Sequence, residues 1–380
     1  MDNHITIIGG GIAGLTVSIA LNRIGFNTQI FESTPEIRAV GAGLGLGANA
    51  IMAFDRLGLK DEVIRLGRIL PSFSIYDQKK KLITRTDSKK TSAKYGVDNF
   101  VIHRAELHQL LLSKIDNQTI YTNKKVINVQ RHENSVKVEF KDGTIHETDF
   151  LIAADGINSA VRKSLLPNVE TRYSGYTCWR AVLDNTNLRL TESSETWGTR
   201  GRFGIVPLAN KKVYWFATVN STRNNNQFKN FSTKDVLNHF QDFHDPIPAI
   251  LKETKDENLL WNDIIDLKPM NQFAFDNILL IGDAAHATTP NLGQGACQAI
   301  EDAVVLATEL SNTKDIKQAF KNFEKRRISR THYIVNTSWK IGRIAQLENK
   351  FLAGLRNFAF RITPSSVSEK QIKKLYQVDF

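Results

Sequence analysis

Three glycines near the N-terminus have the spacing of a phosphate-binding turn. Gly9, Gly11 and Gly14 stand in the run Ile-Ile-Gly-Gly-Gly-Ile-Ala-Gly, which contains the pattern G-x-G-x-x-G. The first glycine permits a tight turn, the second lets a pyrophosphate approach the backbone, and the third lets a helix pack on a strand. The phosphates would then meet free N–H groups at a helix N-terminus. Glu32 follows at the distance at which a carboxylate binds ribose hydroxyls, so this segment predicts a dinucleotide site.

Two later segments bring glycine and aspartate together again. Residues 152–162 read Ile-Ala-Ala-Asp-Gly-Ile-Asn-Ser-Ala-Val-Arg, and residues 281–295 begin Ile-Gly-Asp and end Gly-Gln-Gly. In this order and spacing, the three motifs resemble those of the class A, single-component FAD monooxygenases, the para-hydroxybenzoate hydroxylase superfamily. The resemblance spans roughly residues 4–345. In its motifs the chain is most similar to the urate hydroxylase, salicylate hydroxylase and zeaxanthin epoxidase branches.

The resemblance implies that FAD lies along all three motifs. Asp283 would bind the ribityl chain or ribose, and Arg104 would reach the phosphate side of the flavin. Val126 would meet the adenine through its backbone, while Asp155 and Arg162 would contribute to cofactor placement and to use of the nicotinamide nucleotide. The full set expected to bind the cofactor is Gly9, Gly11, Ala13, Gly14, Glu32, Ser33, Arg38, Gly45, Arg104, Val126, Asp155, Arg162, Asp283, Pro290, Gly293, Gly295 and Ala296.

The resemblance also implies a reaction. NADPH or NADH would reduce FAD, O2 would form a flavin C4a-hydroperoxide, and one oxygen atom would pass to an aromatic or heteroaromatic small molecule. The strands expected between residues 201 and 217 resemble the sheet that roofs the flavin in this family. Arg202 and Tyr214 are therefore candidates for orienting an anionic or phenolic substrate, and Pro290 for lining the pocket. Because there is one glycine-rich fingerprint, we expect the nicotinamide cofactor to bind transiently.

Other activities stay open at this level. The same fold supports epoxidation of an alkene or isoprenoid, and flavin-dependent reduction or oxidation of C–C or C–N bonds. A non-catalytic FAD-fold binding protein or a basic nucleic-acid binder is a further alternative, against which the intact aspartate motifs argue. His286 is interpreted as a positioned loop or helix residue, and Ser159 as a helix cap. The sequence leaves open the substrate and the choice between NADH and NADPH.

The periodicity of the chain indicates how these residues are positioned. A strand from Ile5 to Ile8, a helix to about Ile24 and a strand to Phe31 form one βαβ unit. We predict an α/β fold: a Rossmann-like FAD-binding domain with an inserted β-sheet substrate domain and C-terminal helices. The predicted FAD-binding domain comprises residues 1–70, 100–174 and 268–340, the substrate domain 71–99 and 175–267, and the helical segment 341–380.

Charge and cysteine content narrow the environment and the partners. The net charge is +11, and residues 312–380 hold fifteen Lys/Arg against five Asp/Glu. We interpret this excess as a solvated helix face, and expect no nucleic-acid partner and no stable membrane association. Residues 339–360 form a basic amphipathic stretch for which packing across the domains is favoured over a membrane surface. Two distant cysteines predict no metal site and, with no signal peptide, a soluble, cytoplasmic protein. We expect a monomer or homodimer.

Overall fold

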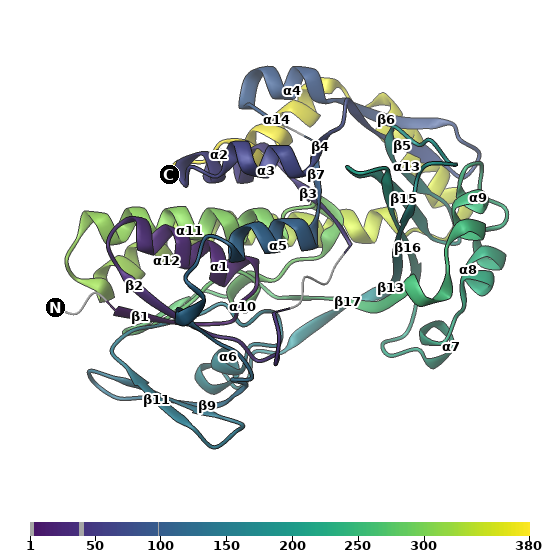
Figure 1. Ribbon diagram of the computed structural model, residues 1–380. Coiled ribbons are helices and arrows are strands. Elements are labelled where there is room, and N and C mark those ends of the chain that lie inside the picture. The colour runs from purple at the N-terminus through teal and green to yellow at the C-terminus, as the bar shows by residue number, and fades with distance from the viewer. Residues whose placement is uncertain (1–3, 38–41, 98) are drawn as a thin grey trace.

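A parallel sheet lies at the centre of the computed structural model, which describes residues 4–37, 42–97 and 99–380 (Figure 1). Its order is β18-β19-β12-β1-β2-β8, and only β18 runs antiparallel to its neighbour. Apart from the first half of β2, the strands are largely apolar, because a parallel sheet is covered on both faces. They are β1 (His4–Ile8), β2 (Asn27–Phe31), β8 (Ile120–Tyr121), β12 (Leu151–Ala153), β18 (Ala274–Phe275) and β19 (Ile278–Leu280).

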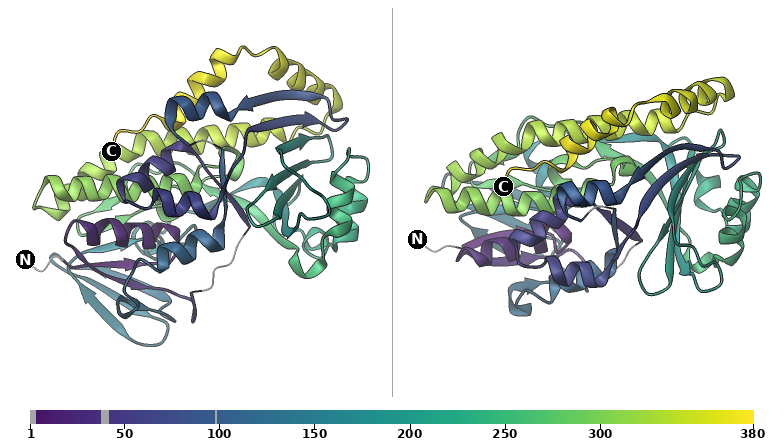
Figure 2. Two further views of the ribbon diagram at one scale, coloured as in Figure 1. Left: turned by 45° about the horizontal axis from the view of Figure 1, so that its top comes forward. Right: turned by 90° about the horizontal axis from the view of Figure 1, so that it is seen from above.

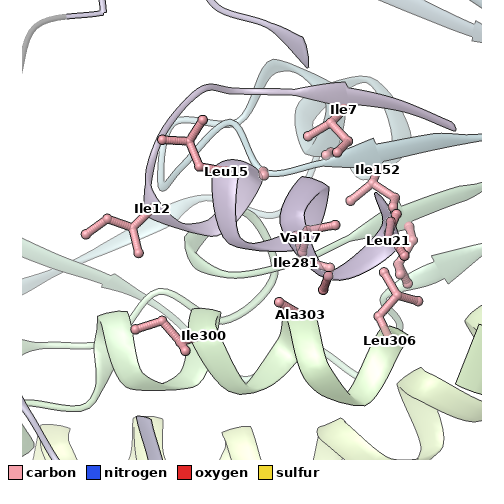
Figure 3. Packing of buried hydrophobic residues seen from close by; sticks show 14 of the residues in the cluster. Ile7, Ile12, Leu15, Val17, Leu21, Ile152, Ile281, Ile300, Ala303 and Leu306 are labelled. Carbon is pink, nitrogen blue, oxygen red and sulfur yellow. The ribbon is translucent and has the colours of Figure 1, made fainter. Parts of the chain in front are cut away.

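Two helices far apart in the sequence cover one face of this sheet. Helix α1 (Ile12–Arg23) lies between the strands and α11 (Gly295–Asn312), as Figure 3 shows. Buried residues of both helices and of the strands form one core that brings the N-terminal glycine turn close to the start of α11. The predicted βαβ unit is confirmed, with Gly25 at φ +87° directly after the C-cap residue Ile24 of the first helix.

A small antiparallel sheet and a short helix lie on the other face of the parallel sheet. Phe31 of β2 stacks on Phe140 with ring centroids 5.1 Å apart, which joins the two sheets. The elements are β9 (Val126–Arg131), β10 (Val136–Phe140), β11 (Ile145–Thr148) and α6 (Ala160–Leu165), with the single-turn helix η1 (Asn117–Thr119) before them.

A separate seven-stranded sheet combines strands from two distant stretches of the chain. Its order is β17-β13-β16-β15-β14-β5-β6. One face packs against α7, α8 and α9, burying Trp179, Phe203 and Trp215. The strands are β5 (Ser72–Asp77), β6 (Leu82–Asp87), β13 (Thr171–Asp184), β14 (Ser193–Trp197), β15 (Arg202–Pro207), β16 (Lys212–Asn220) and β17 (Leu260–Leu267). The helices are α7 (Asn226–Lys229), α8 (Thr233–Phe240) and α9 (Ile247–Glu253), with η2 (Asp256–Asn258).

The helices α8 and α9 are separate elements. Pro246, which lacks an N–H group, stands at the N-cap of α9 and separates it from α8. The remaining elements connect the two large sheets or extend along the molecule. They are β3 (Gly43–Leu46), β4 (Arg68–Ile69), β7 (Phe100–His103), α2 (Ala48–Arg56), α3 (Lys60–Leu66), α4 (Ser88–Tyr95), α5 (Arg104–Leu112), α10 (Asp283–His286), η3 (Pro290–Leu292), α12 (Ile316–Ala345), α13 (Lys350–Ile362) and α14 (Ser365–Tyr376).

The C-terminal helices run along the outer edge of the molecule and span both large sheets (Figure 2). The predicted fold class, an α/β flavin-binding fold with a second sheet and C-terminal helices, is confirmed. The exact division into domains stays a prediction. Within the described ranges, no helix combines the length and apolar character that crossing a membrane requires.

Candidate active site

The N-terminal glycine turn has the shape that an approaching pyrophosphate needs. A Cβ at Gly14 would lie 1.9 Å from the Gly9 carbonyl oxygen, and a Cβ at Gly9 would lie 2.5 Å from the Ala154 carbonyl oxygen. Gly9 also has φ +107°. At Gly11, by contrast, an added Cβ would meet no described atom within 4 Å. Two glycines thus let strand and helix pack closely, and the third leaves open space at the uncapped N-terminus of α1.

The carboxylate of Glu32 is fixed at the end of β2 beside this turn. One oxygen accepts a hydrogen bond from the Gly10 N–H at 2.7 Å, and the other accepts from the Thr34 N–H at 2.8 Å and the Ser33 hydroxyl at 3.0 Å. Burial opposes ionisation, but these hydrogen bonds outweigh it and hold the pKa of Glu32 below its usual value. The carboxylate is therefore ionised and oriented toward the glycine turn. Arg38 lies outside the described residues.

The first aspartate motif forms a loop between β12 and α6. One oxygen of Asp155 accepts hydrogen bonds from the Ala160 and Val161 N–H groups at 2.8 and 3.3 Å. The other oxygen is buried and has no hydrogen-bond partner within the described chain. Burial raises the pKa of Asp155. Ser159 caps α6 by accepting from the Arg162 N–H at 2.9 Å, as the sequence predicts.

Arg162 joins the two aspartate motifs and is fully buried. Its guanidinium donates to the Ile157 carbonyl at 2.5 Å and to the Ala284 carbonyl at 2.9 Å. The side chain thus connects the backbone of the two motifs, and its expected roles in cofactor placement and in use of the nicotinamide nucleotide stay predictions.

The second aspartate motif begins where β19 ends. Gly282 has φ +55° and gives its N–H to a carboxylate oxygen of Asp302 at 2.8 Å. Asp283, the first residue of α10, is accessible at its side chain, although surrounding protein desolvates the carboxyl and raises its pKa. Arg104, exposed at the start of α5, is close enough to favour the ionised form of Asp283. A Cβ at Gly282 would lie 3.0 Å from that of Ala13, so this glycine lets the two motifs meet.

The glycines of the loop before α11 have free space around them. Gly293 has φ +62° and, like Gly45 on β3, would place a Cβ within 4 Å of no described atom. At Gly295 the nearest atom would be a methyl carbon of Thr288 at 3.7 Å. Pro290 is exposed and Ala296 is half-buried. The long helix α11 begins here without a side-chain cap, so the positive end of its dipole faces the same loop.

A buried polar junction ties the seven-stranded sheet to this loop. Arg202, which is 3% exposed, donates to a carboxylate oxygen of Glu195 at 3.0 Å and to the Thr218 hydroxyl at 3.2 Å. It also donates to the side-chain oxygen of Asn291 at 2.9 Å, and Asn291 donates to the Tyr176 hydroxyl at 2.9 Å. Since Asn291 follows Pro290 directly, the open face of the sheet meets the loop predicted to line the flavin.

The residues of this geometry suit an FAD molecule, and comparisons with known proteins agree. A family model described as FAD binding domain matches residues 2–326. The chain is 36% identical over 374 residues to Aurachin C monooxygenase/isomerase of Stigmatella aurantiaca, which covers 98% of this chain and 97% of that protein. It is 31% identical over 376 residues to 2-heptyl-3-hydroxy-4(1H)-quinolone synthase of Pseudomonas aeruginosa, with the same coverage.

The chain belongs to the class A FAD-dependent monooxygenases.

The fold of this FAD monooxygenase matches that of solved relatives. Klebsiella pneumoniae HpxO complexed with FAD and uric acid superimposes with a TM-score of 0.90 at 24% identity, covering 98% of this chain and 96% of that one. FAD is the cofactor and NAD(P)H the reductant, as the resemblance implied.

We call the seven-stranded sheet the roof sheet, and its face away from α7, α8 and α9 the open face. Tyr214 and Phe216 lie on the open face, whereas Phe203 and Trp215 point into the core behind the sheet. Its ring packs on β3, because a Cβ at Gly43 would lie 2.7 Å from the ring. Burial raises the pKa of Tyr214 well above its ordinary value, so the phenol stays neutral. Part of the ring contacts the apolar cluster around Leu70 and Val101. Tyr214 thus combines a packing role with a neutral hydroxyl on the open face.

A buried charge network that was not predicted from the sequence lies beneath the loop Pro290–Ala296, which we call the flavin loop. Asp302 accepts from the Gly282 N–H, from His286 Nε2 at 2.7 Å and from Arg327 Nε at 2.7 Å. Arg327 also donates to Glu301 at 2.7 Å. Glu301 further accepts from Arg330, Gln298 and Asn49. His286 is thus a positioned residue, as predicted. In the sequence, its partner Asp302 is marked only by the acidic pair Glu301-Asp302 within an otherwise largely apolar helical stretch.

Replacing Glu32 with glutamine should lower the folding stability of the monooxygenase near neutral pH. A glutamine has one acceptor oxygen for the several donors around it, so we expect a loss of about 1 kcal/mol or more of unfolding free energy at pH 7. Because the folded-state pKa of Glu32 is lowered, its contribution is present above the unfolded value of 4.5 and disappears as pH falls through the folded pKa. Denaturant unfolding of wild type and Glu32→Gln from pH 7 to pH 3 measures this. Glu147→Gln, exposed on β11, is the control.

A stability difference between wild type and Glu32→Gln that stayed constant over this pH range would contradict the assignment.

Proposed function

We propose that this enzyme uses NAD(P)H and O2 to hydroxylate a heteroaromatic ring of the 4-quinolone type that carries an aliphatic chain. The observation that carries the proposal is the junction of Arg202 and Asn291, where the open face of the roof sheet meets the flavin loop. The quinolone class is drawn from the Pseudomonas relative, whose name describes a 3-hydroxylated heptylquinolone as its product and which matches nearly the whole chain. Removing the introduced hydroxyl from that product gives 2-heptyl-4-quinolone as the test substrate.

The open face of the roof sheet offers groups that suit such a substrate. In the register of the sheet, Arg180 is paired with Phe216, and Val182 with Tyr214. Arg180 donates to Asn262 at 2.5 Å and lies close to the Tyr214 side chain. Guanidinium and phenol donors can hold a ring carbonyl, while the aromatic and aliphatic side chains cover the faces of a flat ring. In this proposal Arg180 and Tyr214 orient the substrate, and Arg202 fixes the roof over the flavin loop.

The cofactor would be held by the three motifs described above. Glu32 binds the ribose hydroxyls, the first-turn N–H groups of α1 bind the pyrophosphate, and Asp283 binds the ribityl chain or ribose. Ser33 acts through Glu32, Arg104 lies at the phosphate side, and Val126 meets the adenine through its backbone. The loop Pro290–Ala296 and Gly45 line the ring. When bound and reduced, FAD supplies the activation of O2, and the start of α11 stabilises negative charge on the ring. We place the enzyme in the cytoplasm, where NAD(P)H is available.

The substrate class is tested by measuring NAD(P)H oxidation with three compounds. We expect 2-heptyl-4-quinolone to stimulate oxidation strongly and to yield a product one oxygen atom heavier. Uric acid and 3-hydroxybenzoate, the substrates named by other relatives, should give little stimulation. Stimulation by either of these and none by the quinolone would show that the substrate class is wrong.

Arg202→Gln should impair turnover while the enzyme keeps its flavin. Loss of the guanidinium breaks the contact between the roof sheet and the flavin loop. The resulting misplacement of the sheet relative to the flavin should cost on the order of 10–100-fold in kcat/KM. The fraction of NAD(P)H oxidised without product should rise as well, because the roof no longer excludes water above the flavin. Arg200→Gln is the matched control, since Arg200 lies two residues away in an exposed ion pair with Asp242.

If kcat/KM and the fraction of NAD(P)H oxidised without product were unchanged in Arg202→Gln, Arg202 would have no role in the site.

A further inference from the structure

Helix α13 has its polar and apolar sides reversed relative to a normal surface helix. Its buried residues are Ala353, Arg356 and Asn357. Arg356 donates to the Ala345 carbonyl at 2.7 Å and lies 5.0 Å from the Trp197 ring centroid. An ordinary surface helix buries its apolar face and exposes its polar one. Here polar groups face the protein, so burial accounts for Ala353 and Phe360 but not for the other large apolar residues of α13.

The large apolar side chains of α13 face solvent. Five of the thirteen exposed large hydrophobic residues in the described chain lie on this one helix. At spacings of three and four residues they form a single face. We call this face the α13 stripe; its members and exposed fractions are Phe351 (79%), Leu352 (45%), Leu355 (56%), Phe358 (57%) and Ile362 (63%). The other exposed positions of α13 are Lys350 at its N-terminus, Gly354 and Ala359, so no polar side chain lies among the members of the stripe.

This exposure differs from the packing expected from the sequence. Helix α13 does contact the seven-stranded sheet, since Phe360 contacts Trp197 of β14 and Arg361 bonds Asp77 of β5 at 2.8 Å, whereas packing across the two domains stays a prediction. Apolar residues of that amphipathic stretch, Phe351, Leu355 and Phe358 among them, face solvent instead. A continuous apolar face of this kind marks an interaction site.

The charge around the α13 stripe indicates what kind of partner it binds. Residues 340–374 contain eight Lys/Arg and two Asp/Glu, and α13 itself contains no acidic residue. Lys340, Arg343 and Lys350 are exposed before the stripe, and Lys370 and Lys373 after it. Two copies of the chain meeting through this face would bring these like charges together. A bilayer with anionic lipids instead attracts the cations and accepts the apolar side chains.

We propose that α13 docks this enzyme on the surface of an anionic membrane, with the α13 stripe inserted at the headgroup level and the flanking cations among the lipid phosphates. The inner side of α13 lies against Trp197, which pairs in register with Arg202 on the open face of the roof sheet. Docking therefore places the roof of the active site next to the bilayer. A substrate with an aliphatic chain, which is the part of this inference that rests on the proposed function, would enter from the lipid phase.

Flotation with lipid vesicles tests the docking with the full-length, flavin-loaded enzyme. Wild type should float with vesicles of phosphatidylcholine and phosphatidylglycerol, and less with phosphatidylcholine alone. Replacing Phe351, Leu355 and Phe358 with glutamine should lower the bound fraction about tenfold or more. Raising salt from about 0.1 to 0.5 M should weaken wild-type binding, because it screens the cations. Ile127→Gln with Ile145→Gln is the control, since these residues are 58% and 56% exposed on another sheet.

The possible outcomes separate docking from the alternatives. Equal flotation of wild type and triple variant, or no flotation of wild type, overturns the proposal. A wild-type dimer that the triple substitution converts to a monomer in sedimentation analysis also overturns it, because the occupant is then a second copy. Melting temperature and bound flavin, both expected to be unchanged in the variant, show that it is folded. Selective flotation with no turnover of 2-heptyl-4-quinolone supports docking and overturns only the substrate class.

Discussion

A Gly11→Val variant should purify as a folded but colourless protein. The added side chain meets no described protein atom within 4 Å of its Cβ, so we expect the melting temperature of the apoprotein to stay close to that of wild-type apoprotein. The same side chain would occupy the space that the pyrophosphate needs. FAD affinity should therefore fall by about 100-fold or more, which corresponds to ~2.7 kcal/mol. Flavin absorbance after purification and titration of apoprotein with FAD measure the effect.

Gly354→Ala is the control for Gly11→Val, because Gly354 also has open space around it but lies on α13, away from the motifs. It should retain FAD fully. A yellow Gly11→Val enzyme with wild-type affinity would show that the cofactor does not lie over this turn.

An Arg327→Met variant should lose more stability than any surface change. Arg327 is 1% exposed and pairs with Glu301 and Asp302, both fully buried. These ion pairs, against the cost of burial, lower the pKa of both carboxyls and raise that of Arg327. Removing the arginine leaves buried negative charge, which costs about 3–5 kcal/mol of unfolding free energy. Chemical denaturation of the apoprotein measures this loss.

The same substitution should loosen the flavin, since Asp302 holds the Gly282 N–H and His286 of the second aspartate motif. Lys325→Met provides the matched control, because Lys325 carries the same charge but is exposed on the same helix. If Arg327→Met and Lys325→Met unfolded at the same denaturant concentration, the network would have no role in stability.

The parts of the structure that sequence could predict are those governed by local patterns. The glycine turn, the first βαβ unit and the Ser159 cap each depend on a few neighbouring residues, and each was predicted correctly. The Glu301–Arg327 network and the Arg202–Asn291 junction join residues 26 and 89 positions apart. No periodicity reports such pairs, because they form only when distant elements pack together.

The orientation of α13 shows the same limit in another way. Its amphipathic pattern is plain in the sequence, but a pattern gives two faces without telling which one meets the protein. Arg356 decides this by reaching the Ala345 carbonyl and the Trp197 ring, contacts that depend on the folded arrangement.

We propose that this flavin monooxygenase acts on a ring held beneath the roof sheet. Turnover of 2-heptyl-4-quinolone with NAD(P)H under dioxygen labelled with oxygen-18 tests this most directly. We expect a hydroxylated product carrying one labelled oxygen atom, with labelled water as the other product. Oxidation of NAD(P)H that yields hydrogen peroxide and unlabelled, unchanged quinolone would contradict it.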